Sequence, residues 1–135
     1  MTDVVPGGVR AAYEALGQAV ADAASAFGAQ PDRASAGAAL GSLAGALEAN
    51  RAALDSELFP AMFESMAGSD AVCIRDMQRN LSDTQRELTR HLVHLAARPD
   101  VDARHQEQLL SGCARYLAYE REEVLAMAER ILVGA

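Results

Sequence analysis

The sequence predicts an all-α domain, built as an antiparallel up-down-up-down four-helix bundle. Half of the 135 residues are hydrophobic and only 4% are aromatic. Val, Ile and Thr are sparse beside Ala and Leu, which favours helices over strands. Apolar residues recur at steps of three and four along four segments joined by short turns. No long linker or internal repeat separates these segments, so residues 1–135 are expected to form a single domain.

The first expected helix starts after Gly8 and ends at Gly28, since glycine readily adopts the conformation that closes a helix. The apolar stripe of this helix consists of Val9, Tyr13, Leu16, Val20 and Phe27. Its one polar interruption is the Tyr13 hydroxyl.

The second expected helix opens at Pro31 and Asp32 and runs to Met66. Pro60 lies well inside this pattern and removes a helical hydrogen bond, which predicts a bend or a break there. Glycines at every fourth residue leave a flat strip where a neighbouring helix can approach closely, at Gly37, Gly41 and Gly45.

Two further helices follow. Gly68 is expected to end the second helix, and Ser69 or Asp70 to cap the third. The stripe of the third helix comprises Ile74, Met77, Leu81, Leu88, Leu92 and Leu95. After Pro99, Asp100 can cap the fourth helix. The stripe of the fourth helix comprises Leu109, Leu110, Cys113, Leu117, Val124, Met127, Ile131 and Leu132.

The charge balance excludes several classes of partner. The formal net charge is −7 and the sequence pI is near 4.8, so no nucleic acid and no anionic membrane surface is expected to bind. All twelve basic residues are Arg, which excludes lysine Schiff-base chemistry. Signal-peptide and membrane-spanning patterns are missing, so we expect a cytoplasmic protein. Cys73 and Cys113 are single and widely separated, and buried free thiols are expected at both.

Each apolar stripe is interrupted by one or two polar groups. Asn50 shares a helix face with Leu47, Leu54 and Leu58. That face should point into the core, where an amide must find hydrogen-bond partners or cost about 1–3 kcal/mol. The other helices offer such partners on their own stripes, namely Tyr13, Gln85, Tyr116 and Glu120.

The three histidines suggest a metal site only weakly. His91 and His94 share a helix face, and His105 begins the next helix. A cation near a helix C-terminus gains a few tenths of a kcal/mol from the helix dipole. This solvated position accounts for His91 and His94 without a metal, so zinc or iron is not expected there.

Several short motifs resemble the hemerythrin-like family. The segment from Leu47 to Pro60 is similar to the helix in which that family has a histidine, two acids and Leu-Phe-Pro. Residues 116–132 resemble the end of its last helix, Met77-Gln-Arg-Asn-Leu81 its third-helix motif, and residues 10–16 its first. The likeness covers nearly the whole chain in order and in helix length.

The resemblance implies a non-haem di-iron centre used in oxygen carriage or sensing. The positions of the family's histidines are occupied here by Tyr13, Asn50, Leu81, Gln85 and Tyr116. Leu54 stands at the carboxylate position of the second helix, and Glu120 or Arg121 in the region of the last-helix acid. Leucines, amides and phenols do not replace an imidazole-carboxylate cage for iron. We therefore expect no metal and no cofactor, and a polar layer in the middle of the bundle.

The favoured interpretation of this layer is a site for a small molecule, lined by Asn50, Gln85, Leu54, Leu81 and Leu117. In an enzyme, Glu120 would serve as acid or base with a raised pKa. Tyr116 and Tyr13 would donate hydrogen bonds to a developing oxyanion. These functional groups, a carboxyl group and two phenols, fit isomerisation, cyclisation or elimination better than hydrolysis or redox chemistry.

Two alternatives stay open. The first is a non-catalytic structural or protein-interaction module whose polar core is fully hydrogen-bonded. Phe59, Phe63 and Met66 could then form an apolar patch, make a homodimer, or simply close the end of the bundle. The second alternative is a residual di-iron protein that binds or senses oxygen.

Overall fold

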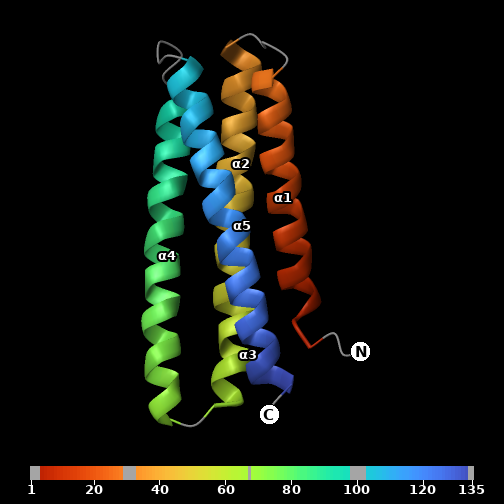
Figure 1. Cartoon of the computed structure of the whole chain (residues 1–135), viewed down its shortest axis with the longest axis vertical. Coiled ribbons are helices and arrows are strands. Elements are labelled where there is room, and N and C mark those ends of the chain that lie inside the picture. The colour runs from red at the N-terminus through yellow and green to blue at the C-terminus, as the bar shows by residue number, and fades with distance from the viewer. Residues whose placement is uncertain (1–3, 29–32, 67, 98–102, 134–135) are drawn as a thin grey trace.

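The fold is helical throughout the part of the chain that the computed structural model describes, residues 4–28, 33–66, 68–97 and 103–133. No strand occurs in these ranges, which confirms the predicted all-α class. The elements are α1 (Gly7–Gly28), α2 (Arg33–Ala53), the π-helical η1 (Leu54–Leu58), α3 (Phe59–Glu64), α4 (Gly68–Ala96) and α5 (Ala103–Val133). They form four columns that lie side by side, with η1 and α3 continuing α2 (Figure 1). None of the described helices is long and apolar enough to cross a membrane.

Two apolar clusters fill the interior. One gathers side chains such as Leu16, Leu43, Leu92 and Leu117, and the other gathers Val9, Leu54, Phe59 and Val124, among further residues of the same helices. Along α2, α4 and α5, the residues of the two clusters lie on either side of one buried polar residue. The apolar stripes therefore continue above and below a polar level, as the sequence predicts.

Pro60 disturbs the helix in a specific way. The chain widens into the π-helical segment η1, where the Phe59 N–H donates to the Leu54 carbonyl, and then resumes as α3 with Pro60 in its first turn. Proline is favoured in the first turn of a helix because its fixed φ suits the helical backbone. The expected interruption is thus a local change of helical pitch.

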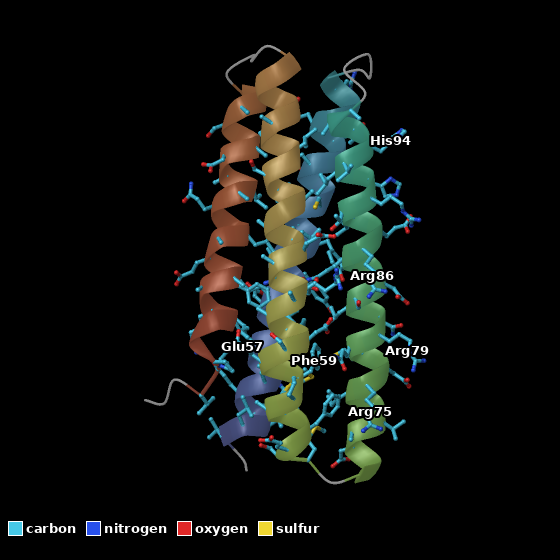
Figure 2. The ribbon with its side chains drawn as sticks, turned by 180° about the vertical axis from the view of Figure 1, so that it is seen from behind. Glu57, Phe59, Arg75, Arg79, Arg86 and His94 are labelled. Carbon is cyan, nitrogen blue, oxygen red and sulfur yellow. The ribbon has the colours of Figure 1, made fainter. Side chains whose placement is uncertain are left out.

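The π-helical segment also fixes the start of α1. Figure 2 shows Glu57 of η1 beside that end of α1. A Cβ added at Gly8 would lie 2.3 Å from a Glu57 carboxylate oxygen, so glycine leaves the space that this side chain occupies. A carboxylate near a helix N-terminus is stabilised by the helix dipole.

Three expectations about small residues and cysteines need correction. A Cβ at Gly37 would lie 3.2 Å from the Ala96 carbonyl of α4, but at Gly41 and Gly45 it would meet no described atom within 4 Å. The close approach of helices is thus limited to one end of the glycine strip. Cys113 is buried as expected, whereas Cys73 is exposed.

The turn between the second and third expected helices also differs from the prediction. Gly68 is the first residue of α4, and α3 already ends at Glu64. Asp70 lies in the first turn of α4. Three residues proposed as helix starts lie outside the described part, namely Pro31, Asp32 and Asp100, and so do Pro99 and the side chains of Phe27 and Ser69.

Candidate functional site

Three buried polar side chains from three different helices meet at the level between the two apolar clusters. Asn50 of α2, Gln85 of α4 and Glu120 of α5 are 0%, 1% and 2% exposed. Each of these residues occupies a position on the apolar stripe of its helix. The packing that buries the stripe therefore also buries the polar side chain. The structure thus brings together three of the residues that the sequence assigns to the polar layer.

A single amide nitrogen holds this group together. Gln85 Nε2 donates to Asn50 Oδ1 at 3.0 Å and to the two carboxylate oxygens of Glu120 at 2.9 and 3.2 Å. The Gln85 amide therefore bridges α2 and α5 from α4. We refer to Asn50, Gln85 and Glu120 as the polar triad.

The triad places a carboxyl group in surroundings that shift its titration. Burial raises the pKa of Glu120 from an ordinary 4.5 to about 7, and the hydrogen bond from Gln85 acts in the opposite direction. Desolvation disfavours the charged form, and a donor to the carboxylate favours it. With a pKa near neutrality, Glu120 can either accept or release a proton at physiological pH.

Two phenols approach the triad from α1 and α5. Burial raises the pKa of Tyr13, electrostatic interactions with Glu120 and then with Tyr116 add to this effect, and the charge of Arg121 opposes it. The pKa of Tyr116 is also raised, by burial and then by Glu120, while a hydrogen bond with Thr84 lowers it. Both phenols are therefore protonated at neutral pH and can act as hydrogen-bond donors.

The polar layer retains unused hydrogen-bonding capacity. Among the described residues, the Tyr13 hydroxyl, Asn50 Nδ2 and Gln85 Oε1 have no hydrogen-bond partner although all three atoms are buried. Leaving such an atom unsatisfied costs about 1–3 kcal/mol, and native networks are usually satisfied. Each of these three atoms can take a water or a polar group of a ligand as its partner.

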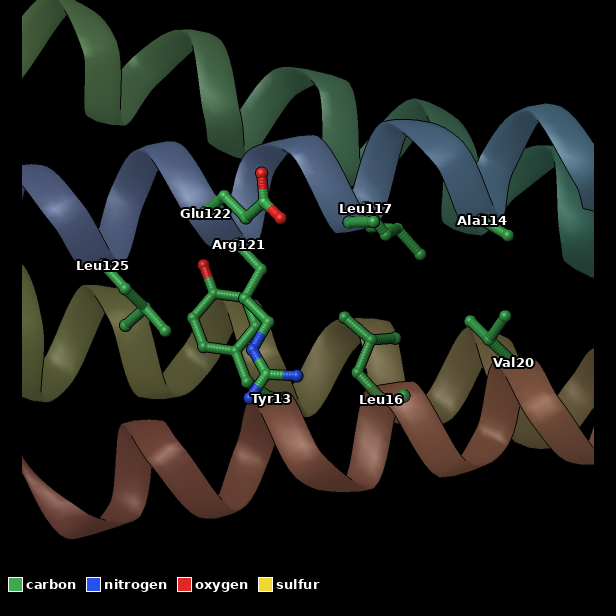
Figure 3. A pocket seen from close by; sticks show the side chains of 10 residues that line it. Tyr13, Leu16, Val20, Ala114, Leu117, Arg121, Glu122 and Leu125 are labelled. Atoms are coloured by element: carbon green, nitrogen blue, oxygen red, sulfur yellow. The ribbon is translucent and has the colours of Figure 1, made fainter.

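Two cavities lie on the two sides of α5. The residues that the sequence assigns to one site are distributed between them. The α4/α5 cavity has a volume of about 310 Å³ and is lined by Glu120, Tyr116, Leu81 and Val124, with Met77 and Met127 beside them. The α1/α5 cavity, about 440 Å³, is lined by Tyr13 and Leu117 (Figure 3). Leu54 is buried in the apolar core, 2% exposed, and lines neither cavity.

Sequence reasoning missed part of both linings. Met77 and Met127 belong to the predicted stripes and were assigned to the core, yet they line the α4/α5 cavity together with Arg130. The resemblance indicates for Arg121 only a place in the region of the last-helix acid, whereas the structure shows that it lines the α1/α5 cavity. Helical spacing indicates which residues face inward, but not which of them are left beside a space.

Two of the three histidines, His91 and His94, lie away from the polar layer, on the surface. His91 is exposed and its Nε2 lies 3.3 Å from Glu87 Oε1 on the same helix, and His94 is exposed near the end of α4. The side chain of His105 lies outside the described residues. Within the described residues, no three His, Cys, Asp or Glu side chains form a group that could hold a metal ion.

The donor set of the polar layer does not fit the iron centre that the resemblance implies. The layer offers one carboxylate, two amides and two phenols, and both carboxylate oxygens already accept hydrogen bonds from Gln85. Non-haem iron sites in proteins combine imidazole with carboxylate ligands. Leu54 and Leu81, which the resemblance would place at two ligand positions, have no donor atom in their side chains.

We accordingly expect protein purified under aerobic conditions to carry no stoichiometric iron or zinc. The measurement is elemental analysis combined with an absorption spectrum. A di-iron content per chain together with an oxo-iron absorption band would contradict the expectation and restore the alternative of an oxygen-binding protein.

Comparisons with protein-family models, with curated proteins and with solved structures gave no match to this chain.

Proposed function

We propose that the protein is a metal-free, hemerythrin-like four-helix bundle of the cytoplasm that binds a small molecule in the α4/α5 cavity and carries out acid/base chemistry on it. The colours of Figure 1 run in opposite directions along neighbouring columns, which supports an antiparallel up-down-up-down topology. Bundles of this kind commonly hold their ligands between facing helices.

The observation that carries the proposal is the position of Glu120. Its side chain is 2% exposed, yet it lines a cavity whose other walls include Leu81 and Val124. Burial raises its pKa to about 7. A carboxyl group with a shifted pKa on the wall of an apolar cavity is the usual arrangement of a general acid or base.

The neighbouring groups have distinct roles in such chemistry. Glu120 removes or delivers the proton. Tyr116 lines the same cavity, and its protonated hydroxyl can donate a hydrogen bond to an oxyanion that forms on the substrate. Gln85 and Asn50 lie behind Glu120 and position its carboxylate through the bonds described above. A positioned base together with an oxyanion donor can serve isomerisation, cyclisation or elimination when negative charge develops on an oxygen of the substrate.

The alternative of a structural or interaction module has less support. Three buried polar atoms of the layer have no hydrogen-bond partner among the described residues, so the described side chains do not satisfy the layer by themselves. Phe59 is 1% exposed and its ring lies 6.3 Å from that of Phe63, so these residues close the end of the helices. Phe63 and Met66 are only half-buried, which keeps a small homodimer contact compatible with the proposal.

A model reaction tests the proposal without knowledge of the natural substrate. In 5-nitro-1,2-benzisoxazole, a base removes the proton on C3, the electron pair of that C–H bond forms a nitrile, and the N–O bond breaks. The oxygen keeps the electron pair of the N–O bond, and the single ring-opened product is the coloured 2-cyano-4-nitrophenolate. A carboxylate in an apolar cavity should accelerate this elimination above the rate given by acetate at equal concentration. The rate should rise with pH through about 7, since Glu120 must be ionised to accept the proton. No acceleration at any pH would reject Glu120 as a base in an accessible cavity.

A further inference from the structure

The α1/α5 cavity on the opposite side of α5 is an apolar groove. Its volume of about 440 Å³ lies in the range typical of small-ligand sites. Leu16 and Val20 of α1 face Leu117 and Leu125 of α5 across it (Figure 3). Gly17 adds to the space, because a Cβ built there would meet no described atom within 4 Å.

The groove continues along the same pair of helices. A second cavity of about 270 Å³ shares Val20 and Ala114 with the first and extends to Leu110. From Leu125 to Leu110 the lining follows α5 for about 22 Å at a rise of 1.5 Å per residue. An opening of this shape fits an extended chain better than a compact ring.

Two polar side chains of the groove, Tyr13 and Arg121, lie close to each other. The Tyr13 side chain is 2% exposed, and its hydroxyl has no hydrogen-bond partner among the described residues. Figure 3 shows the Arg121 side chain extending from α5 toward Tyr13, and the Arg121 charge acts on the Tyr13 hydroxyl. No carboxylate in the described part of the chain forms an ion pair with Arg121.

We propose that the α1/α5 groove is a second binding site, separate from the Glu120 cavity, and that it takes a single-chain alkyl carboxylate. The carboxylate would accept hydrogen bonds from the Tyr13 hydroxyl and the Arg121 guanidinium, since a phenol and a planar guanidinium are both donors to an oxyanion. The alkyl chain would lie along Leu16, Val20 and Leu117 toward Leu110. The Glu122 carboxylate lies on the α5 side of the groove (Figure 3).

Titration calorimetry with three probes below micellar concentrations tests the ligand class. Decanoate should bind the full chain with one-to-one stoichiometry. Acetate, which has the head group alone, should show no binding, and decan-1-ol, which has the chain without the charge, should bind at least about ten-fold more weakly. If decanoate does not bind, or if decan-1-ol binds equally well, the proposal is wrong.

Matched variants locate the site. Gly17→Leu places a side chain in the groove and should weaken decanoate binding more than ten-fold, whereas Gly41→Leu makes the same change on the open surface of α2 and should leave it unaltered. Both replace a helical glycine, so neither is expected to lower helix stability. Tyr13→Phe and Arg121→Gln should each weaken decanoate by about ten-fold and leave decan-1-ol unchanged. Equal decanoate affinity in Gly17→Leu and the parent would overturn the assignment.

Discussion

Glu120→Gln is expected to abolish most of the base-catalysed ring opening, with a loss of roughly 10²- to 10⁴-fold in kcat/KM. The substitution preserves the size of the side chain and keeps an oxygen that can accept a hydrogen bond from Gln85 Nε2. It removes the only group on the cavity wall whose pKa is raised to about 7, and therefore the proton acceptor. The residual rate should no longer rise with pH through 7.

Tyr116→Phe is the matched control for this loss. It changes the same cavity and removes one hydrogen-bond donor, but it leaves the proton acceptor in place. We expect a decrease of about ten-fold, with the pH dependence of the parent retained. Equal rates for parent and Glu120→Gln would move Glu120 from a catalytic to a structural role.

Gln85→Leu is expected to destabilise the folded state by about 3–5 kcal/mol above pH 7. Gln85 Nε2 is the donor shared by Asn50 Oδ1 and the Glu120 carboxylate. Without it, an ionised carboxylate stays buried with no hydrogen-bond donor from α4. Urea unfolding at several pH values measures the effect.

The pH dependence has a definite sign. Below pH 4.5, Glu120 is protonated in both the folded and the unfolded state, and the stability associated with its raised pKa is fully present. In the parent, this stability is lost as pH rises through the folded-state value of about 7, by roughly 3 kcal/mol. Gln85→Leu raises the pKa of Glu120 further, because the hydrogen bond that lowers it is removed. The loss of stability with pH should then be larger and extend to higher pH.

The double variant Gln85→Leu with Glu120→Leu separates two explanations. If the cost comes from the unpaired carboxylate, replacing both residues by leucine should recover most of the stability at pH 8. If the double variant is as unstable as Gln85→Leu at pH 8, the shape of the Gln85 side chain matters and its hydrogen bonds do not. A destabilisation that is the same at pH 4 and pH 8 would lead to the same conclusion.

Hydrophobic spacing predicts much of this structure. The apolar stripes define the four long helices, and the polar residues that interrupt them include all three members of the polar triad, Asn50, Gln85 and Glu120. The prediction succeeds because the 3.6-residue period of a helix assigns each side chain to one face. A face that points into the bundle is buried whichever neighbouring helix packs against it. The types of the three residues then restrict their hydrogen bonds. The Gln85 amide can donate to both the Asn50 amide oxygen and the Glu120 carboxylate, and few other arrangements would satisfy all three side chains.

The division into two cavities was not predictable in this way. Tyr13 and Glu120 were assigned to one site, but they line cavities on opposite sides of α5. The distance between neighbouring helices depends on all the side chains in contact, and periodicity contains no information about it. The same reason explains Gly41 and Gly45, which have suitable spacing for close packing but face no neighbouring helix. The π-helical turn before Pro60 was likewise not predictable, because a proline alone does not specify which distortion the helix adopts.

The polar triad also determines how far each helix can slide along its neighbours. The stripes of leucine and alanine are repetitive, so a shift of one turn, about 5.4 Å, would still place apolar residues against apolar residues. The same shift would move Gln85 Nε2 out of reach of Asn50 Oδ1 and of the Glu120 carboxylate, which lie 2.9–3.2 Å away. An alternative alignment would therefore bury a carboxylate and an amide without partners, at a cost of several kcal/mol. The three residues are 35 positions apart in sequence, from Asn50 to Gln85 and from Gln85 to Glu120, so one side-chain amide selects a single alignment for helices that are distant along the chain.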